Sequence, residues 1–366
     1  MRFSRLTKIL IWLAVAVVVV FGVLLGARSL KPDGTLDDLL AWLPKRHASF
    51  EQLGGSQLLL EVDKDDLIKS RLETVLADIR TLLRDARVGY KGLGQSGREA
   101  HLEIRDPAQV DAAKKALKIF TDPVAGDNPV KEMLLDEPEP GLLRFTLTDD
   151  GLKLRTSMAL AQSMEVVERR VSDGIGVEPI ARPQGNDRIL LQVPGLQTPA
   201  RLTDILGQPG NLTLQMVDTT MPVQDALNGR PPAGSSVLYS QDDPPVPYLV
   251  ENRVIVSGDN IVNAQATYNS AMNEPVVSFA FDTKGKTRFA QATSQNVGRP
   301  FAIILDNQVL SAPIIREPIL GGTGQISGNF TKESAQDLAL LLRSGPMPAK
   351  LKIVDVRTIA PGGVQN

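Results

Sequence analysis

The sequence contains no cysteine and only two histidines, His47 and His101. The missing thiols exclude disulfides, cysteine nucleophiles and thiolate metal sites, and two imidazoles are too few for a histidine-rich metal site. Aromatic residues make up only 4% of the chain, so there are few stacking platforms for single-stranded nucleic acid. Lys plus Arg number 40 and Asp plus Glu 42, a net charge of −2. Without an excess of positive charge to neutralise phosphates, the composition argues against nucleic-acid binding.

No catalytic constellation emerges from the remaining residues. A Ser-His-Asp hydrolase would need one of the two histidines, but His47 lies in a polar linker and His101 lies on the polar side of an alternating strand pattern. Acidic pairs such as Asp149-Asp150 are adjacent in sequence, so their carboxylates point in different directions on a helix and form no acid/base dyad. The sequence therefore predicts no enzyme activity, no metal site and no cofactor.

Two glycine motifs resemble nucleotide-binding loops without meeting their requirements. Gly92–Gly97 reads GLGQSG and matches GxGxxG, but a strand pattern follows where the dinucleotide fingerprint needs a helix, so a hairpin is predicted. Gly285-Lys286-Thr287 lies between a strand and a helix, yet the first glycine of a phosphate-binding loop would fall at Ala280. Asp282 is instead predicted to cap the helix.

The N-terminus carries a long apolar run. Ile9–Ala27 contains nineteen residues without a charge, which as a helix reaches across a hydrocarbon layer of about 30 Å. Basic residues precede it and acidic residues follow from Asp33, so the positive-inside rule places the N-terminus in the cytoplasm and the rest outside the membrane. A cleaved signal peptide shares this order of residues. Against it, the run is longer than the usual apolar region, and Leu25 stands where a small residue is wanted.

The length allows two or three domains, and the hydrophobic patterns predict three α+β units joined by Pro-rich and Gly-rich segments. The first unit has a strand at 57–62, a helix at 65–86, strands at 87–91 and 98–105, and a helix at 107–120. The second has a strand from 142, a helix at 149–173, strands near 180 and at 189–193, a helix at 199–206 and a strand at 212–217. The third has a strand at 276–281, a helix at 283–296, strands at 301–305 and 309–315, a helix at 332–343 and a strand at 351–356. Segments 121–141 and 218–247 are predicted to be irregular. The second unit follows the ferredoxin-like order β-α-β-β-α-β.

Several long segments resemble the SecD family of the bacterial protein-translocation machinery. The most specific is Phe301–Pro361, with further similarity in Phe281–Pro300, in Arg170–Gly195 and in the Gly-Gly motif at the start of Gly54–Asp63. The matching positions are Gly54, Gly55, Arg170, Glu178, Pro179, Gly185, Arg188, Pro194, Gly195, Pro313, Arg316, Glu317, Gly328 and Phe330. Two features depart from the family pattern. Phe50–Leu53 replaces the usual GLDL run, and the family's five further membrane spans have no counterpart in this sequence, so no proton-coupling residue is assigned.

The resemblance implies an α+β protein with an N-terminal transmembrane helix, a ferredoxin-like α/β sandwich base and an α+β head subdomain. The expected divisions are 1–28 for the cytoplasmic tip and membrane helix, 29–55 for a juxtamembrane linker, 56–120 for a first periplasmic unit, 142–224 for the base, 225–345 for the head and 346–366 for a return strand and tail. The protein would lie in the inner membrane with its bulk in the periplasm.

The resemblance also implies the function. The exported region would bind an emerging, unfolded preprotein and assist late translocation driven by the proton-motive force. Its partners would be SecF, the SecYEG channel, YajC and membrane lipid. The Gly-rich stretch around Leu320, Gly321, Gly322, Gly324 and Ile326 has a composition suited to exposed backbone that accepts an extended chain, although a structural turn explains it equally well. One alternative is a membrane-tethered periplasmic holdase or assembly adaptor. Another is a periplasmic hydrolase, but the missing histidine-centred catalytic constellation argues against it.

Overall fold

The computed structural model describes residues 50–124, 129–269 and 274–361, which form a mixed α+β structure. The predicted membrane helix at Ile9–Ala27 lies outside the described residues. Within the described ranges, no helix has the length and apolar character that crossing a bilayer requires.

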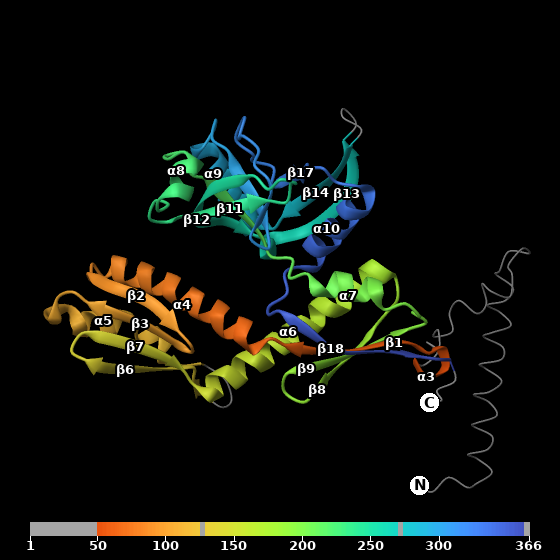
Figure 1. Ribbon diagram of the computed structural model, residues 1–366, viewed down its shortest axis with the longest axis horizontal. Helices are drawn as coiled ribbons and strands as arrows, with labels where there is room; N and C mark the ends of the chain where they lie inside the picture. The colour runs from red at the N-terminus through yellow and green to blue at the C-terminus, as the bar shows by residue number, and fades with distance from the viewer. Residues whose placement is uncertain (1–49, 125–128, 270–273, 362–366) are drawn as a thin grey trace, which may run out of the picture. The chain divides into compact units, whose positions relative to one another are not determined.

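A four-stranded antiparallel sheet, the base sheet, has the strand order β18-β1-β9-β8 (Figure 1). Its strands are β1 (Gly55–Val62), β8 (Ile180–Gln184), β9 (Arg188–Pro194) and β18 (Leu351–Ile359). In β1 every second side chain is buried, as expected of a strand covered on one face. Helices α6 (Asp149–Ile175) and α7 (Ala200–Gly207) contact this sheet. Taken in chain order, β1-α6-β8-β9-α7-β18 is a β-α-β-β-α-β arrangement with two long insertions.

The strands of this arrangement differ from those that the sequence predicted. The strand from residue 142 is β7 (Leu142–Leu147), which pairs with strands of another sheet, and the strand at 212–217 is β10 (Leu212–Val217), which belongs to a barrel. The positions of the missing pair are filled by β1 and β18, which pair along their whole length although 304 positions separate Gly55 from Ile359. Hydrophobic alternation identifies a strand but carries no information about its partner, which explains the wrong grouping.

The insertion between β1 and α6 forms a second antiparallel sheet of order β2-β3-β7-β6. It contains β2 (Tyr90–Ser96), β3 (Glu99–Ile104), β6 (Met133–Glu139), the helices α4 (Lys64–Asp85) and α5 (Val110–Ala116), and a small ribbon of β4 (Pro123–Val124) and β5 (Val130–Lys131). The predicted hairpin is confirmed, because β2 pairs with β3, but the turn is at Gly97-Arg98 and residues 92–96, expected in the turn, belong to β2. The expected helix at 107–120 is instead α5 flanked by two short 3-10 turns. The prediction of irregular structure for 121–141 is wrong in its described part, which contains edge strand β6, where Pro138 is tolerated.

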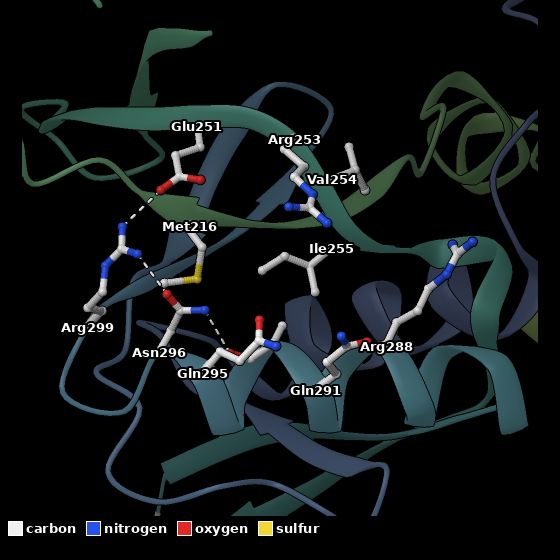
Figure 2. A pocket seen from close by; sticks show the side chains of 11 residues that line it. Met216, Glu251, Arg253, Val254, Ile255, Arg288, Gln291, Gln295, Asn296 and Arg299 are labelled. Carbon is white, nitrogen blue, oxygen red and sulfur yellow. Dashed lines mark hydrogen bonds and ion pairs between the residues drawn. The ribbon is translucent and has the colours of Figure 1, made fainter. Parts of the chain in front are cut away.

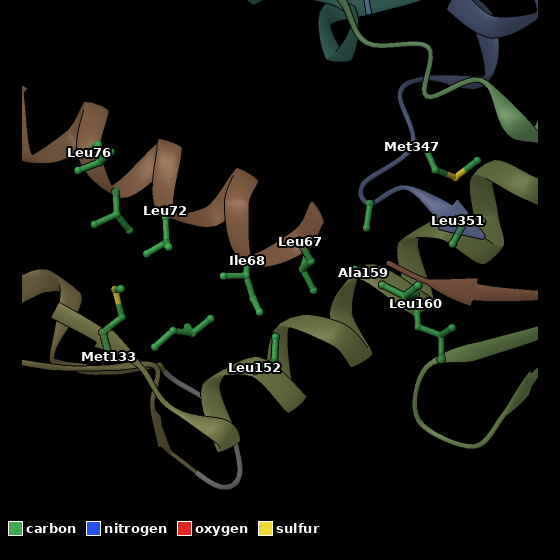
Figure 3. Packing of buried hydrophobic residues seen from close by; sticks show 14 of the residues in the cluster. Leu67, Ile68, Leu72, Leu76, Met133, Leu152, Ala159, Leu160, Met347 and Leu351 are labelled. Atoms are coloured by element: carbon green, nitrogen blue, oxygen red, sulfur yellow. The ribbon is translucent and has the colours of Figure 1, made fainter. Parts of the chain in front are cut away.

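The two sheets share one hydrophobic core. Figure 3 shows Leu67, Ile68 and Leu72 of α4 facing Leu152 of α6. The same core continues to β18 through Leu351. A carboxylate is buried beside this core: Glu132 is only 4% exposed and pairs with arginines from both helices.

The insertion between α7 and β18, which we call the head region (Leu212–Ser344), contains a closed barrel and a three-stranded sheet. The barrel order is β10-β12-β11-β16-β15, and the sheet order is β13-β14-β17. The remaining bounds are β11 (Ser235–Ser240), β12 (Pro247–Ser257), β13 (Ile261–Asn269), β14 (Glu274–Phe281), β15 (Phe301–Leu305), β16 (Gln308–Ser311), β17 (Thr323–Ile326), α8 (Val223–Asn228), α9 (Thr283–Gln295) and α10 (Lys332–Ser344). The sequence analysis missed β12 and β13, and it wrongly predicted irregular structure over α8 and β11. The head region has its own apolar clusters, and only Leu340 among its described buried apolar residues belongs to the core of the two sheets.

Candidate functional site

Helix α9 is fixed in the head region by its cap and by one aromatic anchor. The Asp282 carboxylate accepts a hydrogen bond from the Gly285 amide at 2.6 Å, as predicted for a cap, and this bond together with the Asn260 amide lowers the pKa of Asp282. Phe289 is 2% exposed and meets the rings of Phe281 and Phe301 edge to face. Because this side of α9 is held in the core, the side that carries Arg288, Gln291 and Gln295 faces outward.

The outward side of α9 and strand β12 enclose a groove of about 720 Å³ (Figure 2). Its apolar lining comes from Met216, Val254, Ile255 and Ala292, and its polar lining from Glu251, Arg253, Arg288, Gln291, Gln295, Asn296 and Arg299. The lining is thus mainly polar, whereas a typical small-molecule pocket is mostly apolar, so the groove is better suited to a polar or charged ligand.

The groove carries an excess of positive charge. Arg299 is neutralised, since it donates to Glu251 at 2.9 Å and to Asn296 at 2.7 Å. Arg253 and Arg288 have no ion pair or hydrogen bond with any other described residue. Both side chains are exposed. Two guanidinium groups at this groove therefore remain available to an anionic ligand.

The predicted binding segment Leu320–Ile326 lies away from this groove. Ile319 hydrogen-bonds through its amide to Thr293 of α9, and Gly322 packs against the Lys286 stem. Lys286 and Thr293 are seven residues apart and share the side of α9 opposite to Arg288. Leu320 is 63% exposed, and Gly321 is also exposed, so these two positions are open to a partner.

The other predicted positions in the segment fill structural roles. Gly322 is buried, and a Cβ on Gly324 would lie 2.6 Å from the Phe279 ring. Ile326 is 0% exposed and packs in the head core, so its side chain is not available to a bound chain. Strand β17 forms one edge of its three-stranded sheet.

Arg170 ties α6 to both chain segments that connect the head region to the base sheet. Its side chain is fully buried. The guanidinium donates to the Ile205 carbonyl in α7, to the Gln208 and Pro209 carbonyls on the outgoing connection, and to the Gly345 carbonyl on the returning one. Burial lowers the pKa of Arg170 to about 10, which still leaves it charged at neutral pH.

The contacts around Arg170 extend to its neighbours. Gly210 leaves room for the guanidinium, since a Cβ there would lie 2.7 Å from it. The Asp306 carboxylate accepts hydrogen bonds from the Gly210 and Asn211 amides at 3.1 and 2.8 Å. One turn beyond Arg170 on α6, Asp173 pairs with Arg343 of α10 at 2.7 Å. The junction thus joins elements that are distant in sequence through a polar network in which Arg170 is buried and the Asp173–Arg343 pair is partly exposed.

The Gly-Gly motif is explained by close backbone packing. Gly54 and Gly55 have φ of 63° and 143°, and a Cβ on either would collide with backbone oxygens of β18 or β9. The Gly54 carbonyl also accepts a hydrogen bond from the Gly195 amide. These positions start the central strand of the base sheet.

The other motif positions lie in turns and at strand ends. Arg188 pairs with Glu61 of β1 at 2.7 Å, and Pro194 lies opposite Gly55. Gly185 lies in the β8–β9 turn, Glu178 is exposed and Pro179 is half-buried. Pro313, Arg316 and Glu317 are exposed, and Gly328 packs against the half-buried Phe330.

Comparisons with known proteins relate these parts to one family. The family description "SecDF, P1 head subdomain" matches residues 235–349, and "Protein translocase subunit SecDF, P1 domain, N-terminal" matches residues 160–219. Protein translocase subunit SecD of Rickettsia felis is 34% identical over 84% of the chain, and that of Acetobacter pasteurianus is 36% identical over 86%. The chain belongs to the SecD family.

The matched relatives are longer than this chain. The alignments span 58% of the Rickettsia SecD and 59% of the Acetobacter SecD. A solved SecDF structure, reported as that of a membrane component that enhances protein export, is 31% identical. The match covers 55% of this chain and 94% of the chain in the solved structure, with a TM-score of 0.45.

The sequence analysis singled out Arg170 but none of the charged residues of the groove. Arg253 and Arg288 are 35 positions apart and lie on a strand and a helix that were not expected to be neighbours. In residues 249–256 the apolar residues stand in two blocks around Glu251–Arg253 and do not alternate, so no period-two pattern indicated strand β12. Among the described residues, no three His, Cys, Asp or Glu side chains are placed to hold a metal ion. The groove and the exposed positions Leu320 and Gly321 are the surfaces that the described residues offer for binding.

Proposed function

We propose that this SecD-family chain uses its head region to contact an unfolded preprotein during Sec-dependent export. The observation that carries the proposal is that the part of the chain matching the P1 head subdomain, residues 235–349, contains the open groove between α9 and β12. An uncapped groove with apolar and polar lining suits transient binding of an extended chain.

The rest of the proposal concerns the cellular setting. The Ile9–Ala27 run would anchor the chain in the inner membrane, with the described residues in the periplasm. SecF, the SecYEG channel and YajC are the proposed partners, together with membrane lipid. The chain would contribute binding and no chemical catalysis. Energy from the proton-motive force would enter through the further membrane spans that the family carries. No residue of this chain is assigned to proton coupling.

The base would supply a rigid support for the head region. The β-α-β-β-α-β arrangement is proposed to be a ferredoxin-like sandwich, and the Arg170 junction would be the connection through which the head region is held. Leu320 and Gly321 are proposed as a second contact for the preprotein on the other side of α9.

The test is site-specific photocrosslinking in native membranes. A photoreactive amino acid replaces Val254, which lines the groove and is 44% exposed, and the preprotein is arrested during export. The control replaces Leu134, an aliphatic side chain in β6 that is 52% exposed. We expect an adduct with the arrested preprotein from position 254 and little from 134. Equal yields at both positions would contradict the proposal, and an adduct that forms without the channel would favour the holdase alternative.

A further inference from the structure

The groove between α9 and β12 contains two types of polar group that no other described residue satisfies. One is the pair of guanidinium groups of Arg253 and Arg288. The other is the pair of amides of Gln291 and Gln295, which follow each other at i, i+4 on the outward side of α9 and have no hydrogen-bond partner among the described residues. Unlike Arg299, none of these four side chains has an ion-pair or hydrogen-bond partner in the described part of the chain.

These groups match different parts of one ligand. A guanidinium presents a planar set of donors that fits a carboxylate in a bidentate manner. A glutamine amide offers both a donor and an acceptor, which is what the N–H and C=O groups of an extended backbone require. The apolar lining from Met216 and Ile255 can accept an aliphatic side chain of the same ligand.

We infer that this groove is a docking site for extended, acidic segments of the client polypeptide. The inference rests on the proposed function, because the client is taken to be a preprotein, and it adds a preference for carboxylate-bearing segments. The charge of the groove is local: the chain as a whole has a formal net charge of −2, so its overall charge does not attract acidic peptides.

A membrane surface is a poorer match for the same groups. Recognition of anionic lipid typically uses clusters of four to eight basic residues, whereas the groove offers two unpaired arginines. The groove is concave and carries amide groups, which contribute little to contact with a flat array of headgroups. Binding of anionic lipid vesicles is therefore tested as the competing possibility in the experiment below.

The experiment measures fluorescence anisotropy of two unstructured peptides with a neutral dye, using the full chain. One peptide carries Glu at alternate positions, and the other carries Gln at the same positions. The test variant is Arg253→Gln with Arg288→Gln. The matched control is Lys69→Gln with Lys332→Gln, which removes the same charge from two exposed side chains that have no ion pair or hydrogen bond with another described residue. A third variant, Arg253→Lys with Arg288→Lys, keeps the charge but loses the bidentate geometry.

We expect the acidic peptide to bind about tenfold more weakly to the double Gln variant, because two exposed charge pairs are lost. The neutral peptide should bind equally to both proteins, the control pair should leave both affinities unchanged, and the Lys variant should recover part of the loss. Higher salt should weaken the acidic peptide selectively. Thermal unfolding confirms that each variant is folded.

Three results would overturn the inference. They are equal losses in the test and control variants, no preference for the acidic peptide, or arginine-dependent binding of anionic phosphatidylserine vesicles without binding of the acidic peptide. If the preference is absent but the adduct from position 254 still forms, the inference alone fails. If the acidic peptide binds through the two arginines but no preprotein adduct forms, the proposed function fails instead.

Discussion

Replacing Arg170 with Met would test the junction between the base and the head region. Met keeps much of the length of the side chain but removes every donor of the guanidinium. The variant would leave acceptors in α7 and on both connections without their donor, at Ile205, Gln208 and Pro209 on one side and Gly345 on the other. Arg170→Lys is the companion variant, because it retains a charge but cannot reach acceptors on both sides at once.

The magnitude follows from these contacts. Leaving a buried acceptor without its donor costs about 1 to 3 kcal/mol, and four carbonyls lose their donor here. The variant also avoids burying a charge, which offsets part of the loss. We therefore expect Arg170→Met to lower the free energy of unfolding by about 3 to 5 kcal/mol. The free energy of unfolding of Arg170→Lys should lie between that of Arg170→Met and that of the unsubstituted protein.

The assay combines urea unfolding followed by circular dichroism with hydrogen exchange. Exchange should accelerate first at the two connections, around Gln208–Asn211 and Gly345–Met347, because their backbone bonds depend on the guanidinium. The core strands of the base sheet should lose less protection than the connections. The reasoning is refuted if Arg170→Met changes the free energy of unfolding by less than about 1 kcal/mol, below the cost of a single unsatisfied acceptor.

Three further predictions concern the cores and the Gly-Gly motif. Glu132→Gln should cost about 3 kcal/mol in denaturant unfolding, because two arginine partners are lost. Burial alone would raise the pKa of Glu132, but hydrogen bonds from Arg155 and Arg71 outweigh it and lower the pKa below 4.5. The stabilisation is therefore present above pH 4.5 and is lost as pH falls through the lowered pKa, a loss that Glu132→Gln should abolish in acid titrations. Gly55→Ala should cost more than about 2 kcal/mol in thermal or urea unfolding, since its Cβ would strike a β9 carbonyl; a neutral result would contradict this packing. Phe289→Ala should lower the stability of the head region by about 3 to 5 kcal/mol, measured as faster hydrogen exchange in β14 and β15. Unchanged protection in β1 would support separate cores. An equal loss of protection in β1 would contradict them.

The sequence predicted individual helices more successfully than it predicted strand partners. Helices α4, α6, α9 and α10 have one-sided apolar patterns, and each was expected within a few residues of its observed bounds. Strand pairing depends on contacts that no local pattern encodes, so β1 and β18 were assigned to separate units. Segment 133–139 was missed because Pro138 and acidic residues hide the alternation of an edge strand.

The candidate site was also missed because it depends on contacts between residues that are distant in sequence. Composition identified Leu320–Ile326 as rich in glycine, but it could not reveal that the Lys286 stem and the Phe279 ring occupy the space beside two of those glycines. The groove depends on Arg253 and Arg288, which are brought together only by the packing of α9 against β12. Arg170 was singled out through the family resemblance alone, and its role became visible only with its carbonyl partners.

The central claim, that the head region meets the preprotein as it emerges, is tested most directly by a series of export intermediates of increasing length. Each is arrested in native membranes that contain the chain with a photoreactive residue at position 254. The account predicts no adduct while the preprotein is still within the channel and a sharp onset once enough of it has emerged. An adduct that is absent at every length, or that has the same yield before emergence, would contradict the claim.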